Sequence, residues 1–133
     1  LSGWRKNIYS FPPIGSPDSG AYTTVGDLDL FMRALVANRL LSKQFTEDLF
    51  KPKIMYRQTA RATYMMGYGF EFALEPGGRR IMYMQKDGEN PGVDGVLRYY
   101  PDTATVVAIL ANQDCNVWDI ANEVGQALKG LQI

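Results

Sequence analysis

The sequence contains no histidine and only one cysteine, Cys115. Without histidine, the base that most often activates a serine or cysteine nucleophile is missing, and His-based zinc sites are excluded. One cysteine cannot form an internal disulfide, so we interpret Cys115 as a small, half-buried thiol. The chain also contains no Ser-x-x-Lys, a motif in which a lysine accompanies a serine nucleophile. The residues therefore imply no metal or organic cofactor and supply no complete nucleophile–base pair.

An excess of one charge is also missing, because 14 Lys and Arg balance 14 Asp and Glu. Electrostatic binding to phosphates needs clustered Lys and Arg, so we expect no nucleic-acid partner. No apolar run approaches the roughly 18 residues that suggest a membrane span, and no basic-then-apolar signal segment opens the chain. With 46% apolar residues, the 133 residues predict one folded domain or part of one.

The first part of the chain predicts an extended segment followed by two helices. Residues 1–22 are dense in proline and turn formers, and we expect them to lie extended over a core. Residues 23–51 show apolar positions at helical spacing. Thr24 and Ser42 precede these runs and can act as N-caps. In the second, shorter helix, Phe45 is expected to face inward.

The second part of the chain predicts a sheet and a closing helix. Residues 68–112 contain four strand-like runs separated by turn signals, which indicates a four-stranded antiparallel meander. The run Thr105–Ala111 is nearly all apolar and is typical of a central strand covered on both faces. Asn116 can cap a helix over residues 116–130. The expected fold class is α+β, with helices packed on the sheet.

Between these parts, residues 51–66 carry four basic residues and no acid. One interpretation is a basic loop beside an anionic substrate. The other is a solvated connection, which is favoured because runs of charge usually face water. The basic residues are Lys51, Lys53, Arg57 and Arg61.

The triplet Lys86-Asp87-Gly88 follows the apolar run Ile81–Met84 and precedes Glu89-Asn90-Pro91-Gly92. A cation, a spacer and a glycine at the end of a strand can present a positive charge and bare backbone to a ligand. The same residue types are common in plain turns, so the triplet alone favours a charged strand end.

Several segments in order resemble one family. Gly20–Leu28 resembles its Gly-Gly-(Leu/Tyr)-x-Ser/Thr-x-x-Asp-Leu helix entry, and Leu40-Leu41-Ser42 resembles its Leu-Leu-Ser connection. Tyr68-Gly69-Phe70 resembles its Tyr-Gly-(Leu/Phe) strand, and Lys86–Asp94 resembles its His-x-Gly-x-x-Pro-Gly-Phe segment. Ala111-Asn112 resembles the end of its Leu-Thr-Asn strand. Together they resemble the C-terminal portion of a protein of the serine β-lactamase-related, penicillin-binding-protein-like family, which includes β-lactamases, D-Ala-D-Ala carboxypeptidases and related esterases.

The resemblance implies a role for each residue of the triplet and its neighbours. Lys86 would supply positive charge near the nucleophile and toward a substrate carboxylate, and Gly88 would let an acyl substrate lie along the strand. The backbone N–H of Glu89 would be one oxyanion donor. The residues expected to contact the substrate are Lys86, Asp87 and Asn90. Asp87 stands where the family often has Thr, Ser or Gly, and would partly neutralise Lys86; Glu89 stands where a small residue is usual.

The resemblance also implies what else the activity needs. In this family a Ser-x-x-Lys and a Tyr-x-Asn or Ser-x-Asn precede the segment seen here. We therefore expect the chain to be the C-terminal part of a serine hydrolase that acts through an acyl-enzyme on β-lactam, D-Ala peptide or ester substrates. Alone, it is predicted to be inactive. Its expected partners are the missing N-terminal half of the same protein and a small amide or ester substrate.

A second interpretation remains open. The chain could be a non-catalytic binding module that associates with a second copy through an exposed sheet face or edge. The family resemblance suggests a bacterial periplasmic or secreted protein, as many members are exported.

Overall fold

The computed structural model describes residues 3, 6–7, 10, 14–16 and 19–130. Much of the predicted extended segment 1–22 lies outside the described residues. The described part contains three helices: α1 (Val25–Val36), α2 (Lys43–Leu49) and α3 (Val117–Gly130). It also contains six strands: β1 (Ile54–Gln58), β2 (Thr63–Met66), β3 (Glu71–Leu74), β4 (Ile81–Asn90), β5 (Val93–Tyr100) and β6 (Thr105–Ala111).

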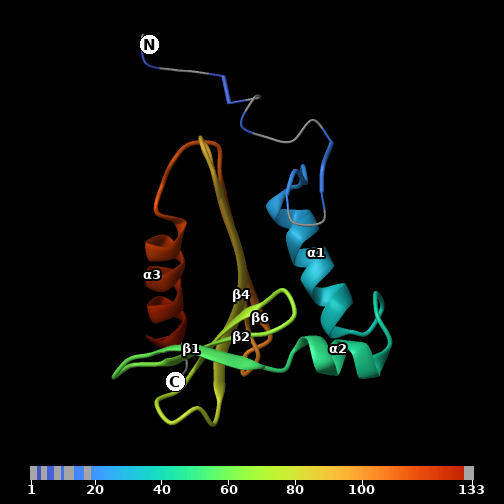
Figure 1. Ribbon diagram of the computed structural model, residues 1–133, viewed down its shortest axis with the longest axis vertical. Helices are drawn as coiled ribbons and strands as arrows, with labels where there is room; N and C mark the ends of the chain where they lie inside the picture. The colour runs from blue at the N-terminus through green and yellow to red at the C-terminus, as the bar shows by residue number, and fades with distance from the viewer. Residues whose placement is uncertain (1–2, 4–5, 8–9, 11–13, 17–18, 131–133) are drawn as a thin grey trace.

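The strands form one antiparallel sheet in the order β1-β2-β3-β4-β5-β6, so each strand pairs with its neighbours in sequence (Figure 1). The prediction of an antiparallel α+β meander is right in kind, but the predicted number of strands, four, is wrong. The sheet has six, because residues 54–58 and 63–66 form a further hairpin at one end.

The extra hairpin escaped prediction because its strand β1 is exposed along its whole length. A strand without a buried face shows no apolar alternation, and its basic residues indicate a solvated loop. In the structure two of these cations lie over tyrosine rings: Arg57 is 4.1 Å from the Tyr64 ring centre, and Lys53 is 4.8 Å from that of Tyr68. The basic segment is therefore largely a hairpin, stabilised by cation–π contacts.

The predicted caps of α1 and α2 are confirmed. The Thr24 hydroxyl accepts a hydrogen bond from the Asp27 N–H at 3.1 Å, and the Ser42 hydroxyl accepts one from the Phe45 N–H at 3.4 Å. The prediction that Phe45 faces inward is wrong, because 67% of this residue is exposed. Helix α2 has only seven residues, and its buried position is Thr46.

The helices cover opposite faces of the sheet, with α1 and α2 on one side and α3 on the other (Figure 1). The α1 face holds the larger apolar core, which contains Met32, Leu35, Phe70, Phe72, Leu74, Met84, Leu97 and Tyr99. The α3 face holds a smaller cluster of Val96, Val117 and Ala121. Helices α1 and α3 both contact β6, as expected for an apolar strand. In the sheet formed by the described residues, β6 is the last strand and not a central one.

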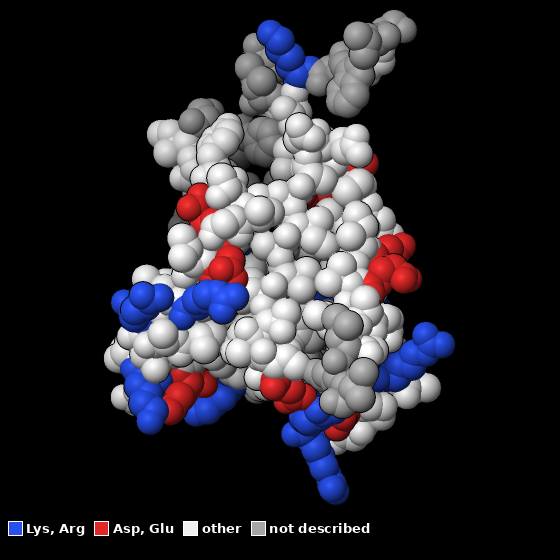
Figure 2. Space-filling view, turned by 180° about the vertical axis from the view of Figure 1, so that it is seen from behind, with Lys and Arg blue, Asp and Glu red and all other residues white. Residues whose placement is uncertain are grey.

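Charges of both signs are interspersed on the surface. Figure 2 shows the molecule from behind, with Lys and Arg side chains close to Asp and Glu side chains around the margins and an uncharged surface between them. Among the described residues, no helix is long and apolar enough to cross a membrane.

Candidate functional site

The predicted site residues lie on the part of β4 that extends beyond its neighbour β3. The β3–β4 pairing runs from Leu74–Ile81 to Glu71–Gln85 and stops there. From Lys86 to Asn90, β4 pairs with β5 on one side. Within the described residues, no strand pairs with this segment on the other side. Backbone groups on that side are available to a ligand that adds along the strand.

Alternation along β4 assigns the side chains of the segment to the two faces of the sheet. Met84 belongs to the core on the α1 face, so Lys86, Gly88 and Asn90 lie on that side. Gln85 and Asp87 line a pocket on the α3 face, so Glu89 lies on that side. The negative side chain of Glu89 therefore points away from the face that carries Lys86, while its N–H stays in the plane of the sheet.

Gly88 borders open space. A Cβ placed on this glycine would meet no described heavy atom within 4 Å beyond its chain neighbours, and no left-handed φ requires a glycine there. Its cross-strand partner is also a glycine, Gly95. Packing within the described structure gives no reason for a glycine at position 88, so the bare backbone beside Lys86 calls for another explanation.

Lys86 is exposed, and its Nζ donates a hydrogen bond to the backbone oxygen of Asp87 at 2.6 Å. The Asp87 carboxylate has a different partner: its Oδ2 accepts a hydrogen bond from the indole Nε1–H of Trp118 at 2.6 Å. Residue 87 is thus held on both faces, by Lys86 through the backbone and by α3 through the side chain. The side chains of Lys86 and Asp87 do not pair with each other.

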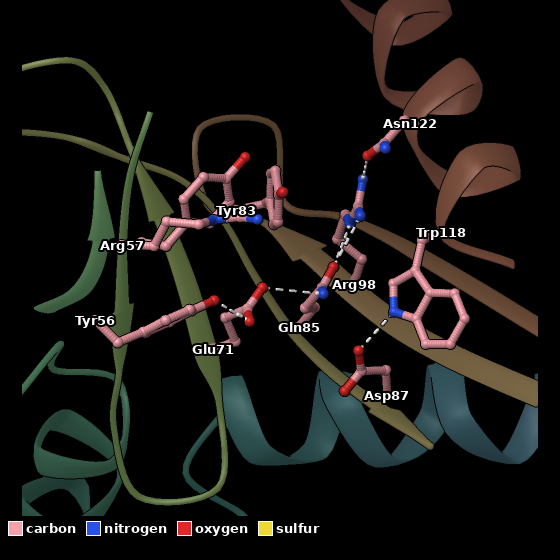
Figure 3. A pocket seen from close by; sticks show the side chains of 10 residues that line it. Tyr56, Arg57, Glu71, Tyr83, Gln85, Asp87, Arg98, Trp118 and Asn122 are labelled. Carbon is pink, nitrogen blue, oxygen red and sulfur yellow. Dashed lines mark hydrogen bonds between the residues drawn. The ribbon is translucent and has the colours of Figure 1, made fainter. Parts of the chain in front are cut away.

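A pocket of about 320 Å³ lies beside this contact, on the α3 face (Figure 3). It is lined by Tyr56, Arg57, Tyr64, Glu71, Tyr83, Gln85, Asp87, Arg98, Trp118 and Asn122. In Figure 3 a line of hydrogen bonds runs from Tyr56 through Glu71, Gln85 and Arg98 to Asn122. The Asp87–Trp118 bond forms a separate link at the edge of the pocket.

The pocket is organised around Arg98, which is 2% exposed. Its guanidinium donates to Gln85 Oε1 at 2.8 and 3.0 Å and to the Ala121 carbonyl oxygen at 3.1 Å. The guanidinium also lies 4.0 Å from the ring centre of Tyr83. All of these partners are neutral. Burial raises the pKa of the Tyr83 hydroxyl to about 12, although the nearby Arg98 cation opposes this shift.

The sequence interpretation missed this polar network. Arg98 stands inside the apolar run of β5, and a charged residue at such a position signals a buried partner. Trp118 is the second residue of α3. Its link to Asp87 joins positions 31 residues apart, and no local pattern reports such a contact. Among the described residues, no group of three or more His, Cys, Asp or Glu residues is placed to hold a metal ion.

The fold is similar to that of a known protein. No family model matches the sequence, and no curated protein matches it either. A solved structure does: the penicillin binding protein from Bacillus halodurans, with 30% sequence identity and a TM-score of 0.82 over 95% of this chain. This chain has a penicillin-binding-protein-like, β-lactamase-like fold. The resemblance inferred from the motifs is therefore confirmed. The match spans 36% of the length of the Bacillus halodurans protein.

Proposed function

We propose that this chain is the C-terminal part of a serine hydrolase that acts through an acyl-enzyme on a β-lactam, a D-Ala peptide or an ester. One observation carries the proposal: Lys86 and Gly88 share one face of a strand segment whose edge has no neighbouring strand in the described structure, and Gly88 borders open space. An extended acyl substrate needs such an edge, because its backbone can pair with it while the glycine lets it approach.

Lys86, Glu89 and Asn90 each have a role in this proposal. Lys86 attracts the carboxylate of the substrate and adds positive charge near the nucleophile. The Glu89 N–H donates to the oxyanion that forms when serine attacks the carbonyl carbon. Asn90, on the same face as Lys86, contacts the substrate beyond the glycine.

The nucleophile itself is supplied by residues outside this sequence. The chain contains no Ser-x-x-Lys, and the similar penicillin binding protein is much longer than this chain. The partner we propose is therefore a further segment of the same protein that carries the serine and its lysine. No step of the proposed reaction requires a metal or an organic cofactor.

The test begins with the coding sequence upstream of Leu1. The proposal expects a Ser-x-x-Lys followed by a Tyr-x-Asn or Ser-x-Asn. The complete polypeptide should then form a covalent adduct with a fluorescent penicillin, detected on a denaturing gel. Lys86→Ala should slow adduct formation at least tenfold, because it removes one charge-assisted hydrogen bond to the substrate and a loss on the order of tenfold is expected for such a bond. The matched control, Lys129→Ala at the end of α3, should leave the rate unchanged.

Two results would contradict the proposal: a start codon immediately before Leu1, or equal rates for Lys86→Ala and the unchanged protein. The first would favour the binding module instead. One observation fits that alternative, namely that the uncharged strand β6 lies at the end of the sheet. A strand edge of this kind can pair with another chain.

A further inference from the structure

The β4–β5 hairpin, which carries Lys86 and Gly88, is tied to the start of α3 at three points. The Trp118 indole N–H donates to Asp87 Oδ2, the Cys115 backbone N–H donates to Asp94 Oδ2, and the Gly92 backbone N–H donates to Asp114 Oδ1. Each of these donor–acceptor distances is 2.6 Å. The α3-side residues of these three bonds lie within residues 114–118, which include the start of α3. All three bonds have a carboxylate acceptor, which makes them stronger than bonds between neutral groups.

At the position of the triplet, β4 is paired on one side only, with β5. From Lys86 onward β4 has lost its pairing with β3. Gly88 faces Gly95 across the β4–β5 ladder, so this pair contributes no cross-strand side-chain contact. Strand segments that pair on one side only open more readily than the rest of a sheet. Among the described residues, the side-chain hydrogen bond to α3 that lies closest to Gly88 in sequence is the Asp87–Trp118 bond.

Trp118 is well placed to act as an anchor. It packs against the cluster of Val96, Val117 and Ala121, in which Val117 and Ala121 are fully buried. A donor fixed in this way holds its acceptor at a defined position, whereas a mobile surface side chain would not. The Asp87 carboxylate therefore ties the triplet to the rigid part of α3, on the face opposite to Lys86.

We propose that Asp87 is a positioning residue: through its hydrogen bond to Trp118 it fixes the backbone of Lys86–Glu89 against α3. This inference rests on the proposed function, in which Lys86, Gly88 and the Glu89 N–H meet the substrate. It gives Asp87 a role other than the substrate contact expected from the motif. Asp87, the middle residue of the triplet, holds the backbone of the site from the α3 face, opposite to the face that carries Lys86.

The test uses the 133-residue chain and hydrogen–deuterium exchange measured by mass spectrometry. Trp118→Phe keeps most of the ring packing and removes the N–H donor, and Asp87→Ala removes the acceptor. In both variants, peptides within residues 86–94 should exchange about tenfold faster, as expected for the loss of a charge-assisted hydrogen bond. Peptides from β6 should exchange at an unchanged rate.

Two further variants separate positioning from general destabilisation. Asp87→Asn keeps an oxygen acceptor for Trp118 and should restore most of the protection. Asn122→Ala removes an acceptor of Arg98 one turn further along α3, and should leave residues 86–94 unaffected. In the NMR spectrum the Trp118 Nε1–H resonance should move upfield in Asp87→Ala and stay near its original position in Asp87→Asn.

The inference is overturned if residues 86–94 exchange at the same rate in Trp118→Phe, if exchange accelerates equally throughout the sheet, or if asparagine fails to restore protection. Because no substrate is involved, these results do not depend on the penicillin labelling described above. A failure of the positioning role can therefore be told apart from a failure of the proposed function.

Discussion

The two faces of the sheet are built from different interactions. On the α1 face, eight buried residues form a continuous core with no charged member, and Phe72 and Met32 are completely buried. On the α3 face, a buried arginine is held by neutral acceptors beside a pocket with two carboxylates, and the apolar cluster has three buried members. The first face stabilises the fold by excluding water. The second fixes positions by directional hydrogen bonds.

The proposed site uses both faces. Lys86 and Gly88 lie where the apolar face ends and becomes exposed, and Asp87 reaches the polar face behind them. A strand at such a boundary can expose two residues to a ligand while the residue between them is held. Substitutions on the two faces should therefore lower the free energy of unfolding by different amounts and for different reasons.

The largest expected effect comes from the apolar face. Phe72→Ala removes a fully buried ring from the main core and should lower the free energy of unfolding by about 4 kcal/mol. Phe45→Ala is the matched control, because Phe45 is 67% exposed; it should cost under about 1 kcal/mol. Urea denaturation followed by circular dichroism measures both. Equal losses would contradict the view that stability comes mainly from this face.

A smaller effect is expected from the polar face. Arg98→Met keeps an unbranched side chain but leaves Gln85 Oε1 and the Ala121 carbonyl oxygen without their donor. Unsatisfied buried acceptors should lower the free energy of unfolding by about 2 kcal/mol. The exposed Arg39→Met serves as the control and should change it by less than about 0.5 kcal/mol. If Arg98→Met were more stable than the unchanged chain, the buried guanidinium would be a cost to folding and the network would not support the fold.

The smallest effect appears only at alkaline pH. Because the pKa of Tyr83 is raised from 10.0 to about 12, the hydroxyl ionises in the unfolded chain before it does in the folded one. Its contribution to stability is complete below pH 10 and is lost as the pH rises to about 12. Tyr83→Phe should therefore lose less stability between pH 9 and about pH 11.5 than the unchanged chain does.

The control for this measurement is Tyr22→Phe, because Tyr22 is 99% exposed. Its free energy of unfolding, measured by urea denaturation, should change between the two pH values by the same amount as that of the unchanged chain. The same pH dependence in Tyr83→Phe and in the unchanged chain would show that Tyr83 is not buried by the polar face in solution.

The sequence was most informative where a residue acts locally. Thr24, Ser42 and Asn116 cap helices within three residues of their partners, and each was predicted as a cap. The strand-like runs predicted an antiparallel meander over residues 68–112, and β3, β4, β5 and β6 do pair in this sequence order. The order of the family motifs carried the resemblance that the solved structure confirmed.

The sequence was least informative where contacts join distant segments or where no face is buried. The β1–β2 hairpin was missed because β1 is exposed throughout. The final position of β6 in the sheet has no local signature, since its apolar run only indicates that helices cover both faces. The partner of Asp87 could not be predicted either, because Trp118 is brought to it by the packing of α3 on β5.

The central claim is that this chain carries the substrate-facing strand of an acyl-transfer site without the nucleophile. The most direct test is the intact mass of the purified 133-residue chain, measured under denaturing conditions after incubation with benzylpenicillin and with a reactive ester. The account predicts that the mass of the chain does not change. A mass increase equal to an acyl adduct, mapped to one of its serines, would contradict it.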